Sequence, residues 1–433
     1  MTRLRRNVRF ARFLAQSLLL VLAFSLVASA QTVDLEMWSW TALSGIRYDT
    51  LKALVDRFNE EHDGIHINLT QKNTAQAELF PAVAAGAGPD LFNGSSSWIG
   101  AYSRVGIVAN LDTYIERHEQ GQAFFDDLHP GVLATIRPGG TTRALPYNLE
   151  LYGIYSNPSV LNEAGVPSPQ PGWNWDDLRE FGSKLLVVDN EGRIARGAYG
   201  MASSLSTTWT FLGSAGGTLF DSEGRRSALL SDAAIEAFTF MDDLLRSNLL
   251  GPLGVEARSM FIGGRAGFFI DGSQRISLLR QEGMSALDVL PPVQGPRGHR
   301  HSTLAFIAMF ITASTNPVKE EAAWKAVKYL TSPEAQAFYN AAVMGFPARL
   351  SSVNDPAYRS VLDQDDVMRA WVERVSPVAS SAGYSGTPGD AEAGAVFAQE
   401  FTRFLTTLPP VRVYLEELDR TINLTLDRAW GAE

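Results

Sequence analysis

The sequence predicts an α/β protein built from two lobes, and three observations carry that prediction. The chain has 433 residues, which is more than one domain usually holds. Segments in which apolar and polar residues alternate, as in strands, are followed by segments in which apolar residues recur at helical spacing. Apolar residues make up 45% of the composition, enough to fill two cores. Strands that alternate with helices imply parallel pairing through right-handed crossovers.

Residues 1–30 differ from the rest and are expected to be a secretory signal peptide. Five arginines and no acidic residue stand at its start. An apolar run over 13–27 follows, and Ala28-Ser29-Ala30 then forms a small-residue cleavage site before Gln31. The run is short for a membrane span, although an N-terminal anchor helix is the alternative. The mature protein is therefore expected to be exported and soluble.

The charge balance narrows the class of partner. Removing the five leader arginines from the 37 basic side chains leaves 32 against 47 acidic ones, a net charge near −15. Such a balance argues against nucleic acid or an anionic membrane as the main partner and is compatible with a neutral ligand. The chain has no cysteine, which excludes disulfides, thiolate metal sites, cysteine nucleophiles and a lipidated N-terminal cysteine.

The first lobe begins with two expected strands at 33–38 and 65–69, each followed by residues with helical spacing. A short buried strand at 89–93 then leads into "SSSWIG" and a helix. In open α/β sheets, ligands bind beyond the carboxyl ends of strands, where helix N-termini present free N–H groups. The serines at 95–97 therefore stand where a ligand would be met, although they could serve only as caps and Trp98 only as core.

The remaining elements follow in order. A strand is expected over 150–156, and a helix over 172–186 with Asn174 or Asp176 as its cap and Trp175 in the core. The segment 208–224 is Gly-rich and is expected to be a loop. A Pro/Gly-rich linker is expected at 290–303, with His299 and His301 in solvent. The later predicted elements are a helix around 235–245, a strand and Gly-Ser loop within 260–276, a buried strand at 304–311, and two helices divided at Ser332-Pro333.

Enzyme motifs are missing from the sequence. It has no G-x-S-x-G elbow, no H-E-x-x-H and no phosphate loop ending in Lys-Ser or Lys-Thr. Three pairs of adjacent acids lie on expected helices and are interpreted as solvated faces. Glu150 differs, because it starts a strand beside tyrosines, where a carboxylate could accept two hydroxyls of a polyol. The alternative is an exposed or salt-bridged side chain, and a glycosidase that uses Glu150 plus a second acid stays open.

Several aromatic residues fall near expected junctions of loops and strands. Sugar rings pack their C–H faces on aromatic rings, while their hydroxyls seek carboxylates and amides. These aromatic residues are Trp38, Trp40, Trp98, Tyr147, Tyr152, Trp209 and Phe211.

Taken in series, several segments resemble one known family, the maltose-binding-protein-like solute-binding proteins of ABC sugar importers. They include "LEMWSW", "AGAGPDLF", "LPYNLELYGIYSNPSVLNEAGV", "SAGGTLFDSEG", "MFIGGRAGFFIDGSQR" and "GFPAR". The resemblance implies the type II periplasmic-binding-protein fold, with discontinuous lobes joined by a hinge that closes on a sugar. It places the N-terminal lobe at 31–147 plus 302–346 and the C-terminal lobe at 150–298 plus 350–433. The chain is then expected to cross between lobes near 147–151, 298–302 and 346–350.

The resemblance also implies a binding protein without enzymatic activity, cofactor or metal. Its expected partner is the permease of the importer, and the protein is expected to be a monomer. Because it lacks a lipid-anchoring cysteine, it is expected to be free in the periplasm. The family often has Gly-x-Trp where this chain reads Gly272-Ser273-Gln274, which removes a common stacking aromatic. The ligand-binding residues that the resemblance implies are Trp40, Asn93, Ser96, Ser97, Glu150, Trp209, Gln274, Phe346 and Tyr384.

A second interpretation keeps the architecture but changes the ligand. Relatives of the same family bind glycerol 3-phosphate or a related phosphorylated polyol. Arg275 and Arg349 could then form a phosphate clamp, although ordinary salt bridges are the alternative for both. The acidic overall balance does not favour a phosphorylated ligand.

Overall fold

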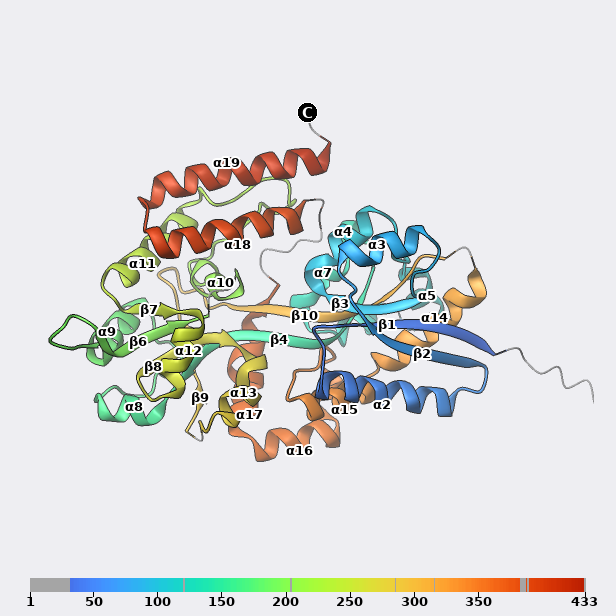
Figure 1. Ribbon diagram of the computed structural model, residues 1–433, viewed down its shortest axis with the longest axis horizontal. Coiled ribbons are helices and arrows are strands. Elements are labelled where there is room, and N and C mark those ends of the chain that lie inside the picture. The colour runs from blue at the N-terminus through green and yellow to red at the C-terminus, as the bar shows by residue number, and fades with distance from the viewer. Residues whose placement is uncertain are drawn as a thin grey trace, which may run out of the picture.

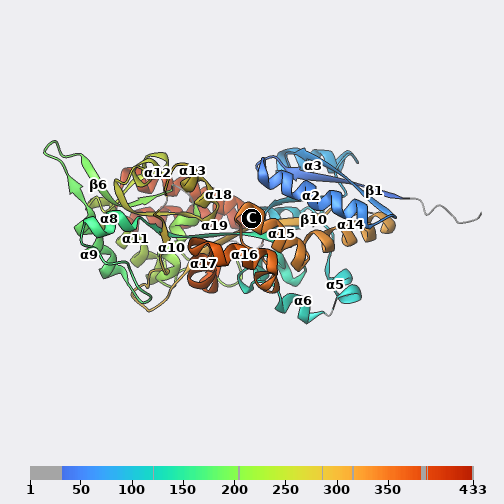
Figure 2. The same ribbon diagram turned by 90° about the horizontal axis from the view of Figure 1, so that it is seen from below.

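The computed structural model describes residues 32–119, 121–202, 205–284, 286–314, 316–381, 387 and 389–431, without the side chains of residues 76 and 205–208. The expected signal peptide and Tyr384 lie outside these residues. Two lobes lie side by side and give an elongated molecule (Figures 1 and 2). Within the described part of the chain, no helix has the length and apolar character needed to cross a membrane.

The first lobe is built on parallel strands. Strand β1 (Val33–Trp40) pairs in parallel with β2 (Ile65–Lys72) on one side and with β3 (Leu91–Ser95) on the other. Helices on both faces complete the α/β pattern that the sequence predicts. The helices of this lobe are α2 (Ile46–Glu61), α3 (Gln76–Ala84), α4 (Ile99–Arg104), α5 (Asp112–His118), α6 (Gln122–Asp126), α7 (Leu133–Ile136), α14 (Pro317–Leu330) and α15 (Pro333–Val343).

Two long antiparallel strands join the lobes. Strand β4 (Leu145–Ser156) pairs with β10 (Ser302–Ile311) through its first half and with β8 (Ala266–Gly272) through its second half. Strand β10 also pairs with β3, so the order β2-β1-β3-β10-β4-β8-β6-β5 is one continuous sheet. The middle of this sheet therefore belongs to both lobes (Figure 1).

The second lobe surrounds the other end of the sheet. Its strands are β8, β6 (Ile194–Met201), β5 (Val187–Val188), β7 (Leu250–Leu253) and β9 (Asp288–Val289). Helices α16 (Pro356–Gln364) and α17 (Asp366–Ala370) lie beneath the junction of the lobes in Figure 1. The helices of this lobe are α8 (Pro158–Glu163), α9 (Trp175–Leu185), α10 (Leu205–Ser214), α11 (Asp232–Arg246), α12 (Gly254–Ile262), α13 (Ile276–Gln281), α18 (Asp390–Thr407) and α19 (Val411–Trp430).

Helix starts follow the predicted caps. Asn174 accepts hydrogen bonds from the backbone N–H groups of Asp176 and Asp177, and the Asp177 carboxylate completes a capping box at α9. Ser332 caps α15 by accepting from Ala335 N, which confirms the division between the two helices there. Trp175 is buried beneath α9, as expected.

Two expectations about the second lobe need correction. Within the segment 208–224, residues 208–214 belong to helix α10 and only 215–224 form the expected loop, and His301 is buried rather than solvated. Both departures come from one contact, in which the His301 ring packs directly against Gly213 of α10. A Cβ added at Gly213 would lie 2.2 Å from the His301 Cγ. Glycine is therefore present so that the His301 ring can pack against the helix, and it does not signal a loop.

Candidate functional site

The candidate site lies on one face of the sheet, where the lobes join. Strand β10 pairs Ile307 with Ser95 of β3 and Ala305 with Glu150 of β4. Directly opposite residues point to the same face, and residues two apart on a strand do as well. Ser95 and Glu150 therefore share a face across β10. Glu150 is half-buried, whereas every other residue of β4 is buried.

Two tryptophans form an aromatic corner at the ends of β1 and β3. Trp40 ends β1, and Trp98 closes the short 3-10 turn Ser96–Trp98 that follows β3. Their rings meet edge to face with centroids 4.8 Å apart, and both are half-buried. A Cβ on Gly94 would lie 2.9 Å from the Trp98 ring, so glycine is needed for the ring to reach this place. The corner keeps apolar ring surface in contact with solvent.

The three serines after β3 divide into different roles. The Ser95 hydroxyl accepts from Ser97 N and lies 2.9 Å from the Ser97 hydroxyl, so Ser95 is the cap of the turn. Ser96 is buried, and its hydroxyl accepts from Phe306 N at 3.3 Å. Ser97 is half-buried. Of the two serines predicted to contact ligand, Ser97 is therefore the accessible one. Ser96 instead links the end of β3 to β10 through its hydrogen bond with Phe306 N.

Asn93 lies below the site and is completely buried. Its Oδ1 accepts from Trp40 N at 2.8 Å, and its Nδ2 donates to the Tyr147 hydroxyl at 3.2 Å. These bonds fix the end of β1 and hence the Trp40 backbone. Asn93 thus positions a predicted ligand contact and does not present its own amide to solvent.

Glu150 forms an ion pair with Arg47, a residue that the sequence analysis missed. Arg47 Nη1 donates to Glu150 Oε1 at 3.1 Å, and the side chains are 25% and 18% exposed. Burial lowers the pKa of Arg47, but Glu150 and the neighbouring phenols of Tyr339 and Tyr147 outweigh it and leave the pKa raised. The salt-bridged alternative for Glu150 is the one that the structure shows. No local pattern signals this pair, because its members are 103 residues apart.

Gln274 brings the end of β8 to the same region. Its Nε2 donates to the Tyr152 hydroxyl at 3.4 Å, and its neighbour Ser273 accepts from Leu151 N at 3.1 Å. The Gln274 Oε1 is buried and accepts no hydrogen bond from the described residues. Gln274 is therefore an amide with spare hydrogen-bonding capacity, next to the strand that carries Glu150.

Other predicted residues lie elsewhere. Trp209 is 1% exposed and stacks on Phe397 in the core of the second lobe, with centroids 6.0 Å apart. Phe346 is 2% exposed, and its carbonyl accepts from Leu149 N. Neither ring has a free face in this conformation, so the structure gives no support to a ligand contact by either. Tyr384 lies outside the described residues.

The two arginines of the expected phosphate clamp are engaged separately. Arg275 Nε lies 3.1 Å from Asp271 Oδ2. Arg349 is buried and pairs with Asp127 at 3.2 Å, while its guanidinium lies over Phe124. The residues around Arg349 belong to α6 and α15, whereas Arg275 follows β8. In this conformation both arginines are paired as the salt-bridge alternative describes, and nothing in it supports the clamp.

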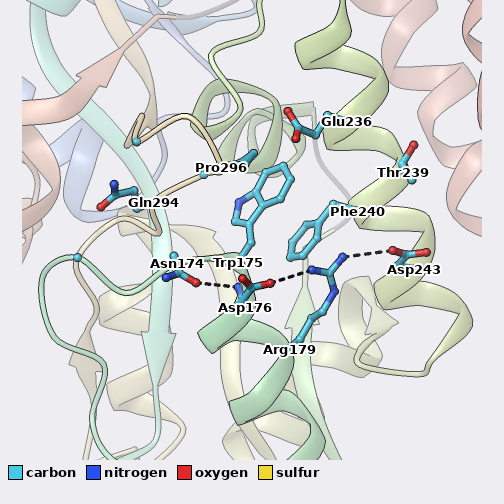
Figure 3. A pocket seen from close by; sticks show the side chains of 13 residues that line it. Asn174, Trp175, Asp176, Arg179, Glu236, Thr239, Phe240, Asp243, Gln294 and Pro296 are labelled. Atoms are coloured by element: carbon cyan, nitrogen blue, oxygen red, sulfur yellow. Dashed lines mark hydrogen bonds and ion pairs between the residues drawn. The ribbon is translucent and has the colours of Figure 1, made fainter.

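A separate hollow of about 600 Å³ opens on the second lobe (Figure 3). It lies between the start of α9, one face of α11 and the loop 294–298, and none of the predicted site residues lines it. Trp175 stacks on Phe240 with centroids 4.1 Å apart, and Arg179 bridges Asp176 and Asp243 beside the Phe240 ring (Figure 3). Because both rings are almost fully buried, the hollow offers no aromatic platform. Among the described residues no group of side chains could hold a metal ion.

Comparisons with known proteins agree on the kind of protein. The family model described as "Bacterial extracellular solute-binding protein" matches residues 43–337, more than half of the chain. A maltotriose-binding protein of Pyrococcus abyssi is 25% identical over 336 residues, covering 74% of this chain and 68% of that protein.

Solved structures show the same fold. The sugar-binding protein MalE of Xanthomonas citri superposes with a TM-score of 0.79 at 17% identity, over 92% of this chain and 99% of that one. UgpB of Mycobacterium tuberculosis, solved in complex with glycerophosphocholine, gives 0.75 at 18% identity over 92% and 99%. The expected two-lobed fold with discontinuous lobes and a hinge is thereby confirmed.

Proposed function

The chain belongs to the family of bacterial extracellular solute-binding proteins, and on that premise we propose that it captures a neutral mono- or oligosaccharide between its lobes and delivers it to the permease of an ABC importer. Membership in this family makes it a binding protein and not an enzyme, so the glycosidase alternative is set aside. The relative from Pyrococcus abyssi, named for maltotriose, supports a sugar as the ligand.

One observation carries the choice of a sugar: the half-buried Trp40–Trp98 corner stands at the ends of β1 and β3, directly after the serine hydroxyls of 95–97, in the same sheet as the half-buried Glu150. The ring corner can cover the C–H face of a pyranose, while Ser97, Glu150 and Gln274 can bind its hydroxyls. Carboxylate and amide groups bind vicinal hydroxyls well because each group offers two oxygen or nitrogen atoms. We therefore assign Trp40, Ser97, Glu150 and Gln274 as ligand contacts, with Asn93 and Ser96 as supports.

The proposed lobes comprise 31–147 plus 302–346 and 150–298 plus 350–433, with crossings at 147–151, 298–302 and 346–350. Closure by rotation of the lobes around these crossings would bury the sugar. An Arg104–Glu392 contact of 2.7 Å between α4 and α18 supports a closed arrangement. We further propose that residues 1–30 are removed on export and that the mature protein is a periplasmic monomer that presents its closed form to the permease.

A phosphorylated polyol is the second candidate, and the structural likeness to UgpB favours testing it. An uncommitted arginine would favour a phosphate, yet Arg275 and Arg349 are paired with carboxylates. The neutral sugar is therefore the better-supported ligand.

The test is a thermal-shift screen of residues 31–433 against glucose, maltose, maltotriose and other oligosaccharides, with glycerol 3-phosphate and glycerophosphocholine as the competing class. A ligand at about a hundred times its Kd stabilises the native state by roughly 2.7 kcal/mol, which raises the midpoint by several degrees. A shift with a neutral carbohydrate, confirmed by calorimetric titration, supports the proposal. Shifts with the phosphates alone would move the assignment to the second candidate, and no shift with any carbohydrate would contradict the first.

A further inference from the structure

The Arg47–Glu150 pair has a consequence for the charge of the ligand. We infer that this ion pair makes the site selective for uncharged ligands, with Glu150 as the residue that repels anions and Arg47 as the residue that holds Glu150 in place. The inference rests on the proposed function, because it concerns the same site. It assigns Arg47 a role in specificity that its place at the start of α2 does not suggest.

Among the described residues, only one of the two carboxylate oxygens of Glu150 accepts a hydrogen bond from a side chain. Its Oε1 accepts from Arg47, while no described residue donates a hydrogen bond to its Oε2. A carboxylate has about four acceptor positions, so Glu150 can bind Arg47 and still accept ligand hydroxyls. Neutral hydroxyls can donate to it, whereas a dianionic phosphate ester or a carboxylate has no proton on its charged group to donate and would meet like charge.

The surroundings of Arg47 explain why it cannot turn to an anionic ligand instead. Its guanidinium is mostly buried and lies near the Tyr147 and Tyr339 phenols. Tyr147 in turn holds Asn93, which holds the Trp40 backbone. Releasing Arg47 would leave Glu150 without its partner in a half-buried place, which is costly. The pair is thus part of the network that positions the aromatic corner.

Other cations near the junction are committed as well. Arg275 pairs with Asp271 at 3.1 Å, and Arg280 makes two bonds to Asp365 at 2.5 and 2.6 Å. Together with Arg47, these arginines make three guanidinium groups in the described part of this region, and each of the three is paired with a carboxylate. None of these three guanidinium groups is free to attract an anion, and the exposed Lys72 opposite Trp40 places its ammonium over the Trp38 ring at 4.4 Å. Selectivity at Glu150 therefore follows from charge balance rather than from size.

The deciding variant is Glu150→Gln, which keeps the shape of the side chain and one acceptor oxygen, replaces the other oxygen with an NH2 donor and removes the negative charge. Arg47 then becomes an unmatched cation beside the ligand. We expect affinity for glycerol 3-phosphate and glucose 6-phosphate to rise by about tenfold or more, with the gain reduced as NaCl is raised. Arg47→Gln is the matched control, because it alters the same pair without freeing a cation, and it should show no such gain.

Calorimetric titrations of the wild type and both variants with maltotriose, glucose, glucose 6-phosphate and glycerol 3-phosphate decide the matter, with circular dichroism to confirm folding. Equal anion affinity in Glu150→Gln and the wild type, or an equal gain in Arg47→Gln, would overturn the inference. Should Glu150→Gln fail to fold, the wild type alone still tests it: a neutral sugar must bind more tightly than its phosphate ester. Failure of the proposed function is a separate result, namely that no neutral carbohydrate binds the wild type.

Discussion

Trp40 and Trp98 meet edge to face at 4.8 Å, and each keeps part of its indole in contact with solvent at the junction of the lobes. Both rings pack partly against the core of the first lobe, and each keeps surface with which it can cover a ligand. We expect Trp40→Ala to weaken binding of the cognate sugar by about tenfold or more, with a small loss of stability. Titration calorimetry measures the first effect and thermal unfolding the second.

The matched control for that substitution is Trp430→Ala. Trp430 is also half-buried, but it lies at the end of α19, where Arg225 covers its ring at 4.2 Å. Its removal should leave the Kd unchanged. An unchanged Kd for Trp40→Ala, or an equal loss in both variants, would remove the aromatic corner from the site.

Ser96 and Ser97 are neighbours with opposite expected responses. Ser96→Ala deprives the buried Phe306 N–H of its partner and should lower the free energy of unfolding by about 1 kcal/mol. Ser97→Ala removes a half-buried hydroxyl and should weaken sugar binding while leaving the unfolding midpoint nearly unchanged. Denaturant unfolding and calorimetry separate the two effects. If the double variant binds sugar as tightly as the wild type, the serines have no role in the site.

Much of the fold could be predicted because local patterns express it directly. The alternation at 33–38 and 65–69 gives strands β1 and β2, which pair in parallel as expected. Asn174 and Ser332 mark helix starts through their own side-chain hydrogen bonds. The exception is instructive: the glycines after 212 suggest a loop, but one of them instead admits a histidine ring against a helix. Glycine is favoured where another group packs closely against the backbone and also where the chain reverses direction, and the sequence alone does not distinguish these two reasons.

The candidate site was predictable only in part. Trp40 and Ser97 follow from the rule that ligands meet the ends of strands. Glu150 follows from family resemblance, because β4 begins at Leu145 and Glu150 lies in mid-strand, not at the strand start that the sequence predicts. Trp209 lies near the same elements, yet its ring turns into the core, because a large aromatic gains more from burial than from exposure. The partner of Glu150 could not be found, since an ion pair between α2 and β4 is created by the tertiary fold alone.

His301 predicts how stability depends on pH. Burial lowers its pKa to about 4, and its Nε2 is buried without a hydrogen-bond partner. In the unfolded chain, histidine binds its proton near pH 6.5. Between about pH 6.5 and 4 the unfolded state therefore binds more protons, so stability falls as the pH falls, by up to about 3 kcal/mol from this residue.

Urea unfolding at pH 7.5, 6 and 5 tests that prediction, with His301→Asn for comparison. The variant should lose less stability than the wild type over this range, although it starts from a lower value because the ring no longer fills its place. His129 serves as an internal reference. Burial also lowers its pKa, and because the His301→Asn substitution leaves His129 in place, its contribution to the pH dependence is the same in both proteins. Parallel pH profiles for the wild type and the variant would show that His301 does not titrate differently on unfolding.

Gly213 predicts a steric effect at the same contact. An alanine Cβ would lie 2.2 Å from Cγ and 2.3 Å from Cδ2 of His301, far inside contact distance. Alanine favours a helix over glycine by roughly 1 kcal/mol, but the clash opposes that gain and cannot be relieved cheaply, because the ring is buried. We expect Gly213→Ala to lower the free energy of unfolding by about 1–3 kcal/mol. Gly64→Ala is the control, since nothing lies within 4 Å of its added Cβ, and it should stay within about 0.5 kcal/mol of the wild type. If the Gly213 variant is as stable as the wild type, the packing of His301 against α10 is looser than the structure shows. The double variant Gly213→Ala with His301→Ala should then separate the clash from the loss of the ring, because removing the ring should restore part of the stability that the added methyl costs.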